Sequence, residues 1–183
     1  MGGFAGKVTR TAIRTHDGVQ MQLGAFNAMP DSDARSVLEP CLGVSRWVDE
    51  VVCARPYAEL AALTAQATAS ARHLTDQELK SALSRHPRLG EAVACTEAPY
   101  SAHEQAGLGV SDHDAARRLA TDNRRYEERF GQVFLIRAAG RSAAEVSTEL
   151  ERRLGNDEAS ERREVVRELR EIALRRLQQV VQP

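Results

Sequence analysis

The chain has 183 residues, of which 42% are hydrophobic and 28% are charged, as expected for one globular domain with a sizeable core. A net charge of −1 excludes an overall field that would attract nucleic acid or an anionic membrane. Aromatic residues make up only 4%, so small aliphatic side chains must fill the core, which favours packed helices over a β-sandwich.

The cysteines and the hydropathy indicate the compartment. Cys41, Cys53 and Cys95 are unevenly spaced and form no CxxC pair, and an odd number argues against a secreted disulfide framework. No apolar run reaches the length of a membrane span, and the N-terminal residues lack the apolar core of a signal peptide. We therefore expect reduced thiols in a cytoplasmic protein.

The hydrophobic pattern begins late in the chain. Residues 1–22 are polar, Gly-rich and aperiodic, so we expect a disordered N-terminal extension before a helical domain over residues 23–183. From Leu23 onward the spacing predicts two helices, with a turn at Pro30 between them and Gly43 ending the second.

Two further helices follow. One begins at Ser45, ends before Pro56 and carries Trp47 on its apolar face, where we expect a core anchor. Residues 57–73 then predict a long Ala-rich helix.

The next helix ends at a histidine. Thr75 and Glu78 form a capping box at its beginning, and Pro87 disfavours helical geometry at the preceding residue, so the helix should end near His86. The negative end of the helix dipole would favour the imidazolium form of His86. A surface or capping histidine is the alternative interpretation.

The middle of the chain combines loops with a long helix. Ser101 and Glu104 have the spacing of an N-cap and its partner, which by itself needs no functional role. A helix is predicted to run from about residue 111 to Phe130, with Gly131 after it. The short apolar run 133–136 is predicted to be buried, either as extended chain or as a helical turn.

Two helices complete the chain, over residues 143–154 and 157–181. Arg176 interrupts the apolar stripe of the last one, whereas the run 161–164 alternates in charge and is interpreted as a solvated face. No convincing alternating strand and no internal repeat appear. The fold class is therefore all-α, a single-domain helical bundle of about seven to nine helices.

The candidate chemistry is limited. No HExxH or CxxC spacing marks a metal site, and no Gly-rich nucleotide loop or GxSxG elbow is present. One imidazole (His86), one carboxylate (Glu104) with its neighbour Gln105, and the apolar run remain. A carboxylate near a histidine suits general acid–base catalysis on a small polar substrate.

Six short motifs stand in a characteristic order. They are Gly43-x-Ser45-Arg46-Trp47, Arg55-Pro56-Tyr57, His86-Pro87-Arg88-Leu89-Gly90, Ser101-x-x-Glu104-Gln105, Asn123-x-x-Tyr126-x-x-Arg129-Phe130-Gly131-x-x-Phe134-Leu135-Ile136, and Leu154-Gly155-Asn156-Asp157. In this order and spacing the chain resembles the OHCU decarboxylases of urate breakdown (2-oxo-4-hydroxy-4-carboxy-5-ureidoimidazoline decarboxylases). The likeness extends from about residue 23 to residue 181.

The resemblance implies an all-helical fold, commonly a homodimer, and a site. His86 would be the catalytic proton donor and Glu104 its partner in catalysis. Arg137 departs from the small residue or cysteine often found at its position, and Arg175 is the alternative to Arg176. The implied substrate-binding residues are Pro87, Ser101, Gln105, Phe134, Leu135, Ile136, Arg137, Ala138 and Arg176.

The implied reaction converts OHCU to S-allantoin without a metal or other cofactor, because the substrate's own ring C=N bond accepts the electrons released with CO2. Two other readings of the residues stay open. A metal-dependent hydrolase built on His86 and Glu104 would contain metal after purification. A non-catalytic helical interaction module would have no pocket joining these residues.

Overall fold

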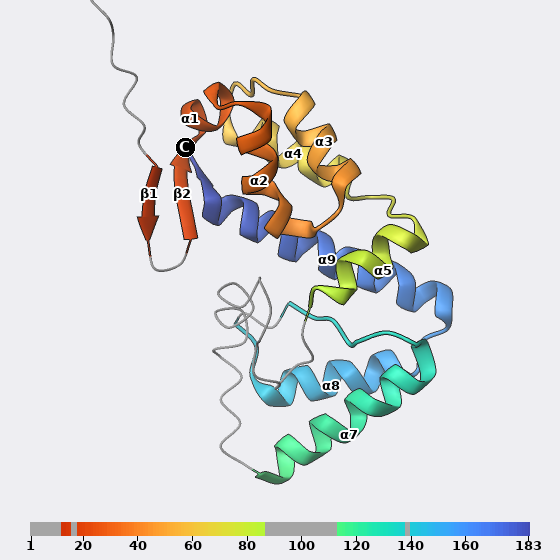
Figure 1. The fold of residues 1–183 in the computed structure, drawn as a ribbon. Helices are drawn as coiled ribbons and strands as arrows, with labels where there is room; N and C mark the ends of the chain where they lie inside the picture. Colours follow the sequence, from red (N-terminus) through yellow and green to blue (C-terminus); the bar gives the residue numbers. More distant parts are fainter. Residues whose placement is uncertain (1–11, 16–17, 87–112, 138–139) are drawn as a thin grey trace, which may run out of the picture.

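Figure 1 shows the computed structural model, which describes residues 12–15, 18–86, 113–137 and 140–183. These residues contain eight α-helices and one small sheet, which confirms the all-α prediction. The helices are α1 (Leu23–Ala28), α2 (Asp31–Leu42), α3 (Ser45–Cys53), α4 (Leu60–Ser70), α5 (Asp76–Ser84), α7 (His113–Phe130), α8 (Ala143–Leu154) and α9 (Glu158–Val180).

Helix α9 is the element on which the others are assembled. In Figure 1 it runs between α1–α4 at the top of the view and α7 and α8 at the bottom, and it packs against α2 and α4. Its inward face joins the main core, in which Trp47 is fully buried and donates a hydrogen bond to the Ala67 carbonyl at 2.9 Å. Trp47 is thus the core anchor that the sequence predicts.

A second, smaller hydrophobic core lies between α7 and α8. The chain that follows α7 runs between the two cores without helical or strand structure. Phe134 and Ile136 belong to the smaller core, whereas Leu135 belongs to the main one. Side chains that alternate between opposite sides are those of extended chain, so the run 133–136 is extended and not a helical turn.

The small sheet was not predicted. Strands β1 (Ala12–Thr15) and β2 (Gly18–Gln22) pair antiparallel, and β2 pairs in parallel with β3 (Val181–Gln182). The expectation of no strand was wrong because β2 is only five residues long and its partner β3 lies at the far end of the chain. Residues 1–11 lie outside the described part, so the domain boundary at residue 22 stays a prediction.

Helix α4 is shorter than predicted. It covers Leu60–Ser70 instead of 57–73. Tyr57 instead exchanges two hydrogen bonds with the side chain of Asn27, and its hydroxyl donates to the Val51 carbonyl at 2.7 Å. These contacts hold the residues before α4 against α1 and α3, where they cannot continue the helix.

The beginning of α5 is fixed by two sets of contacts. The predicted capping box between Thr75 and Glu78 is present in full. Glu78 also accepts a hydrogen bond from Arg46 of α3 at 2.8 Å, and Arg46 donates to the carbonyls of Ser70 and His73 as well. Arg46 therefore ties α5 to α3 and to the end of α4.

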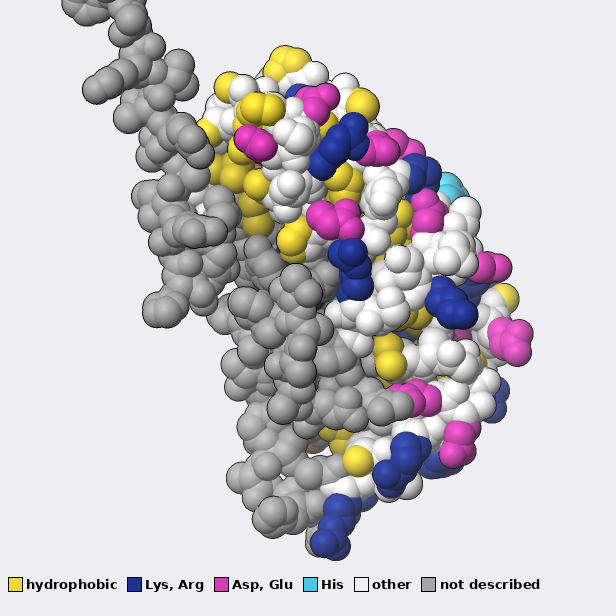
Figure 2. All heavy atoms as spheres, in the orientation of Figure 1, with side chains coloured by type: hydrophobic (Ala, Val, Ile, Leu, Met, Phe, Trp, Pro, Cys, Tyr) yellow, Lys and Arg dark blue, Asp and Glu magenta, His cyan; other side chains and the backbone are white. Residues whose placement is uncertain are grey.

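Charges of both signs are intermixed on the described part of the face drawn in Figure 2. Basic and acidic side chains alternate across the described elements on that face, in keeping with the near-zero net charge. Among the described helices, none combines the length and apolar character needed to cross a bilayer.

The ion pair at the beginning of α5 predicts a pH-dependent stability. The hydrogen bond from Arg46 lowers the pKa of the Glu78 carboxyl, so its stabilising effect is complete above the ordinary pKa of 4.5 and is lost as the pH falls through the lowered value. We expect Glu78→Gln to lower the free energy of unfolding by about 1–2 kcal/mol at pH 7 and by progressively less below pH 4.5, measured by urea denaturation.

The matched control is Glu59→Gln. Glu59 is exposed and makes no ion pair with the described residues, so its replacement should leave the pH profile unchanged. If the loss of unfolding free energy in Glu78→Gln stayed constant down to pH 3, the stabilisation would come from the helix cap and not from the charge of Glu78. That result would contradict the role of the ion pair with Arg46.

Candidate active site

His86 is held at the end of α5 as the sequence predicts. It is buried, with 8% of its surface exposed, and its amide donates to the Leu83 carbonyl. The ring Nδ1 lies 2.9 Å from the Ala82 carbonyl oxygen. Because a carbonyl only accepts, Nδ1 must carry the hydrogen, and Nε2 is then the nitrogen that gains or loses a proton.

The carboxyl end of α2 receives two arginines from distant parts of the chain. Arg85, adjacent to His86, binds the Glu39 carboxylate at 2.8 Å, and Arg176 of α9 donates to the Pro40 carbonyl at 3.0 Å. Cations are favoured at this end of a helix because its last carbonyls lack helical partners. One turn of α2 therefore brings the predicted proton donor and the predicted arginine to the same region.

Gly43 explains why Arg85 fits there. It ends α2 with a φ of +71°, and a Cβ atom at this position would lie 2.5 Å from Cδ of Arg85. Glycine is favoured by the left-handed backbone, and the missing Cβ also lets the Arg85 side chain lie where it does.

A buried ion pair holds the extended chain after α7, residues 134–137, which we call the strip. Arg153 of α8 and Glu161 of α9 are both almost fully buried and form a salt bridge, with Nε to Oε1 at 2.8 Å. Nη1 of Arg153 donates to the Leu135 carbonyl at 2.7 Å. The guanidinium also lies over the Phe134 ring, 4.7 Å from its centroid. One cation therefore fixes both the backbone and a side chain of the strip.

The surroundings of the pair raise the pKa of Arg153 and bind the Glu161 carboxylate. Burial is the largest single influence on Arg153 and lowers its pKa, but the hydrogen bonds with Glu161 and the nearby charges together outweigh it, so the pKa is raised. Burial raises the pKa of the Tyr126 phenol, so its hydroxyl stays protonated and donates to Glu161. Asn156 donates to the other Glu161 oxygen at 2.8 Å. Both oxygens of the Glu161 carboxylate thus accept hydrogen bonds.

A second carboxylate holds the strip further along. Glu168, 3% exposed, accepts a hydrogen bond from the Arg137 amide at 2.8 Å. The Arg137 side chain lies toward α9, with Nε 3.5 Å from Glu171. Arg137, which stands where the family often has a small residue or cysteine, therefore adds a side chain that contacts α9.

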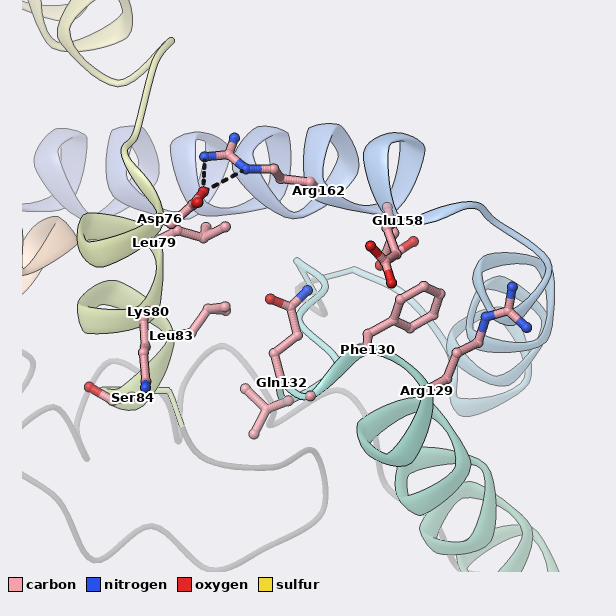
Figure 3. A pocket seen from close by; sticks show the side chains of 13 residues that line it. Asp76, Leu79, Lys80, Leu83, Ser84, Arg129, Phe130, Gln132, Glu158 and Arg162 are labelled. Carbon is pink, nitrogen blue, oxygen red and sulfur yellow. Dashed lines mark hydrogen bonds and ion pairs between the residues drawn. The ribbon is translucent and has the colours of Figure 1, made fainter.

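A groove of about 610 Å³ lies beside this region. It opens between α5, the turn after α7 and the beginning of α9. Figure 3 shows Leu79 and Leu83 of α5 on one side and Phe130 and Gln132 on the other. The predicted site residues of the described part do not line this groove. It does show that the last turn of α5 lies next to the residues that lead into the strip.

The structure describes only part of the predicted site. His86 lies at the end of α5 and Arg176 binds the carboxyl end of α2. The strip residues Phe134, Leu135, Ile136 and Arg137 are held by Arg153 of α8 and Glu168 of α9. Arg176 is buried whereas Arg175 is exposed, so Arg176 is the arginine that faces inward. Pro87, Ser101, Glu104, Gln105 and Ala138 lie outside the described residues, and their roles stay predictions.

Three buried charges were not predicted from the sequence, and one of them was expected at the surface. Glu161, interpreted as part of a solvated face, is 1% exposed, and Arg153 and Glu168 were not singled out. Each stands where the apolar stripe of its helix faces the core, the signal that drew attention to Arg176. Within the described ranges, no cluster of three or more His, Cys, Asp or Glu side chains is placed to hold a metal.

Comparison with known proteins identifies the family. The OHCU decarboxylase family model matches residues 27–178, most of the chain. The chain belongs to the OHCU decarboxylase family. The predicted resemblance is thus confirmed.

The chain is similar to several proteins that are named for urate degradation, over different shares of their length. The chain is 28% identical to the 2-oxo-4-hydroxy-4-carboxy-5-ureidoimidazoline decarboxylase of Haloferax volcanii, over 86% of this chain and 95% of that protein. It is 40% identical to the decarboxylase of the same name from Amia calva, over 43% of this chain and 45% of that protein. A uric acid degradation bifunctional protein of a Bacillus species is 27% identical over 87% of this chain. The chain spans 32% of that protein's length.

Solved structures share the fold. An OHCU decarboxylase crystallised in the presence of (S)-allantoin superposes with a TM-score of 0.61 at 22% identity, covering 82% of this chain and 96% of that one. An (S)-allantoin synthase superposes with a TM-score of 0.65 at 14% identity, covering 87% of this chain and 54% of that one. The helical architecture is therefore that of the OHCU decarboxylase family.

The buried pair makes a prediction about stability. Arg153→Met leaves the Glu161 carboxylate buried without its cation, so we expect a loss of about 3–5 kcal/mol in the free energy of unfolding, measured by urea denaturation. The double change Arg153→Met with Glu161→Leu should lose less, because no buried charge then remains unpaired.

The adjacent arginine provides the control. Arg152 is 48% exposed and pairs with Glu149 and Glu164 at the surface, where screening by solvent keeps the contribution of Arg152→Met below about 1 kcal/mol. Equal losses for Arg152→Met and Arg153→Met would contradict the central role of the buried pair.

Proposed function

We propose that this protein decarboxylates OHCU to S-allantoin without a cofactor, in the cytoplasm and as a homodimer. Membership of the OHCU decarboxylase family over residues 27–178 carries the proposal. The relatives named as OHCU decarboxylases and uric acid degradation proteins support the same substrate. The geometry of His86 supports the proposed mechanism.

The reaction needs little from the protein. The bond between the ring carbon and the carboxylate breaks, CO2 leaves, and the electron pair moves into the adjacent ring C=N bond. A new C=C bond thus forms to the neighbouring ring carbon, and the nitrogen of the former C=N bond takes up a proton. A second proton then adds to that neighbouring carbon, which carries the ureido group, while the hydroxyl on the decarboxylated carbon loses its proton and becomes the carbonyl of allantoin. The protein must orient the ring, shield it from water and deliver the proton to one face. Delivery to one face yields the S enantiomer in place of a racemate.

His86 suits the role of proton donor. The Ala82 carbonyl fixes the Nδ1 hydrogen and therefore the plane and tautomer of the ring. In the imidazolium form the mobile proton is on Nε2, at a position set by the end of α5. Burial of the ring limits proton exchange with bulk water during the reaction.

The remaining roles follow from the family pattern. Glu104 would orient His86 and accept a hydrogen bond from the ureido or hydroxyl group, and Gln105 would bind ring amides. The strip would line the pocket and offer backbone groups to the ring. Arg176, a buried cation, would bind the anionic end of the substrate. Its contact with Pro40 supports this role by holding the guanidinium in place.

Activity tests the proposal through His86. Freshly generated OHCU is added and allantoin is followed by circular dichroism. We expect wild type to give a rapid S-allantoin signal and His86→Asn to lower the rate by roughly 100-fold or more, the usual contribution of a general acid. The control His73→Asn changes an exposed histidine in the loop before α5 and should retain full activity.

Two outcomes would contradict the proposal. A wild-type protein that leaves only the slow racemic product would exclude the reaction. Near-wild-type activity of His86→Asn would leave the reaction in place but assign the proton to another group.

A further inference from the structure

Glu168 has no role in the family pattern described above, yet it is one of the most deeply buried charges in the described part of the chain. It lies in the middle of α9 with 3% of its surface exposed. Oε2 accepts the Arg137 amide at 2.8 Å, and the Arg167 guanidinium lies 3.4 Å from Oε1. The carboxylate therefore reaches out of its own helix to a backbone group of the strip.

Stability alone does not account for this choice. Transfer of a carboxylate into the interior costs several kcal/mol, and an apolar side chain of similar size is often at least as stabilising. Besides its contact with Arg167, Glu168 binds the Arg137 amide, in a segment that pairs with no strand among the described residues. A charge-assisted hydrogen bond is shorter and stronger than a neutral one, which suits a group whose task is to fix backbone position.

The direction of the contact determines which backbone groups remain for a ligand. In extended chain, the N–H and C=O of alternate residues point to the same edge. The Leu135 carbonyl, bound by Arg153, and the Arg137 amide, bound by Glu168, therefore share one edge of the strip. The amide and carbonyl of Ile136, between them, point to the opposite edge.

We propose that Glu168 is a positioning residue of the decarboxylation site. Together with Arg153 it holds one edge of the strip against α8 and α9, so that the donor and acceptor of Ile136 are presented on the other edge at a fixed place. An adjacent N–H and C=O pair complements an amide-type ring edge, which also carries one donor and one acceptor. The inference rests on the proposed function, because it concerns the same substrate pocket.

The test compares two changes at one position. Glu168→Met keeps the length of the side chain but removes the acceptor, whereas Glu168→Gln keeps an acceptor oxygen without the charge. We expect kcat/KM for S-allantoin formation, per folded enzyme, to fall roughly 10- to 100-fold in the Met variant. The Gln variant should retain most of the activity.

The control is Glu171→Met, one turn nearer the carboxyl end of α9. Glu171 is 44% exposed and contacts the Arg137 side chain instead of its amide, so activity should change little. In NMR spectra the Arg137 amide proton should move upfield in Glu168→Met, because it loses its hydrogen bond, and hardly at all in Glu171→Met.

The outcomes separate the two claims. If wild type makes S-allantoin and folded Glu168→Met matches Glu171→Met in kcat/KM, Glu168 has only a structural role and the inference is wrong. If Glu168→Met does not fold, Glu168→Gln and the Arg137 amide signal provide the test. An Arg137 amide signal equal to that of wild type, together with a large loss of activity in Glu168→Gln, would also overturn the inference. If wild type makes no S-allantoin, the proposed function fails instead.

Discussion

The salt bridge between Arg153 and Glu161 is the interaction on which the site region depends. It joins α8 to α9 and receives Tyr126 from α7, so three helices meet at one buried pair. The same guanidinium binds the Leu135 carbonyl. An extended segment that pairs with no strand in the described part of the chain is thereby held in place between two hydrophobic cores. The proposed pocket therefore depends on a buried pair of charges.

The positions of His86 and Arg176 depend on the carboxyl end of α2. Its last carbonyls and Glu39 bind Arg85 and Arg176, which come from α5 and from α9. At its other end, α5 is fixed through Glu78 and Arg46. The motif Gly43-x-Ser45-Arg46-Trp47 thus has a physical meaning: the glycine admits Arg85, Arg46 anchors α5, and Trp47 fills the core beneath them.

Much of this could be predicted from local patterns. The capping box at Thr75, the end of α5 before Pro87 and the core position of Trp47 depend on neighbours within one or two turns, and all three predictions hold. The β2–β3 pairing joins residues at the two ends of the chain, and no local pattern reveals it. The buried charges were visible as interruptions of apolar stripes, but Glu161 lies in an alternating charged run that resembles a solvated face.

The most direct test of the site is to map where the product binds. Titration of isotopically labelled protein with (S)-allantoin, followed by NMR, should shift the Ile136 amide and the His86 ring together, and (R)-allantoin should shift them less. Such a result would place the pocket between the strip and the end of α5. Shifts confined to Leu79, Phe130 and Gln132 would place the ligand in the neighbouring groove of Figure 3 and would contradict the account.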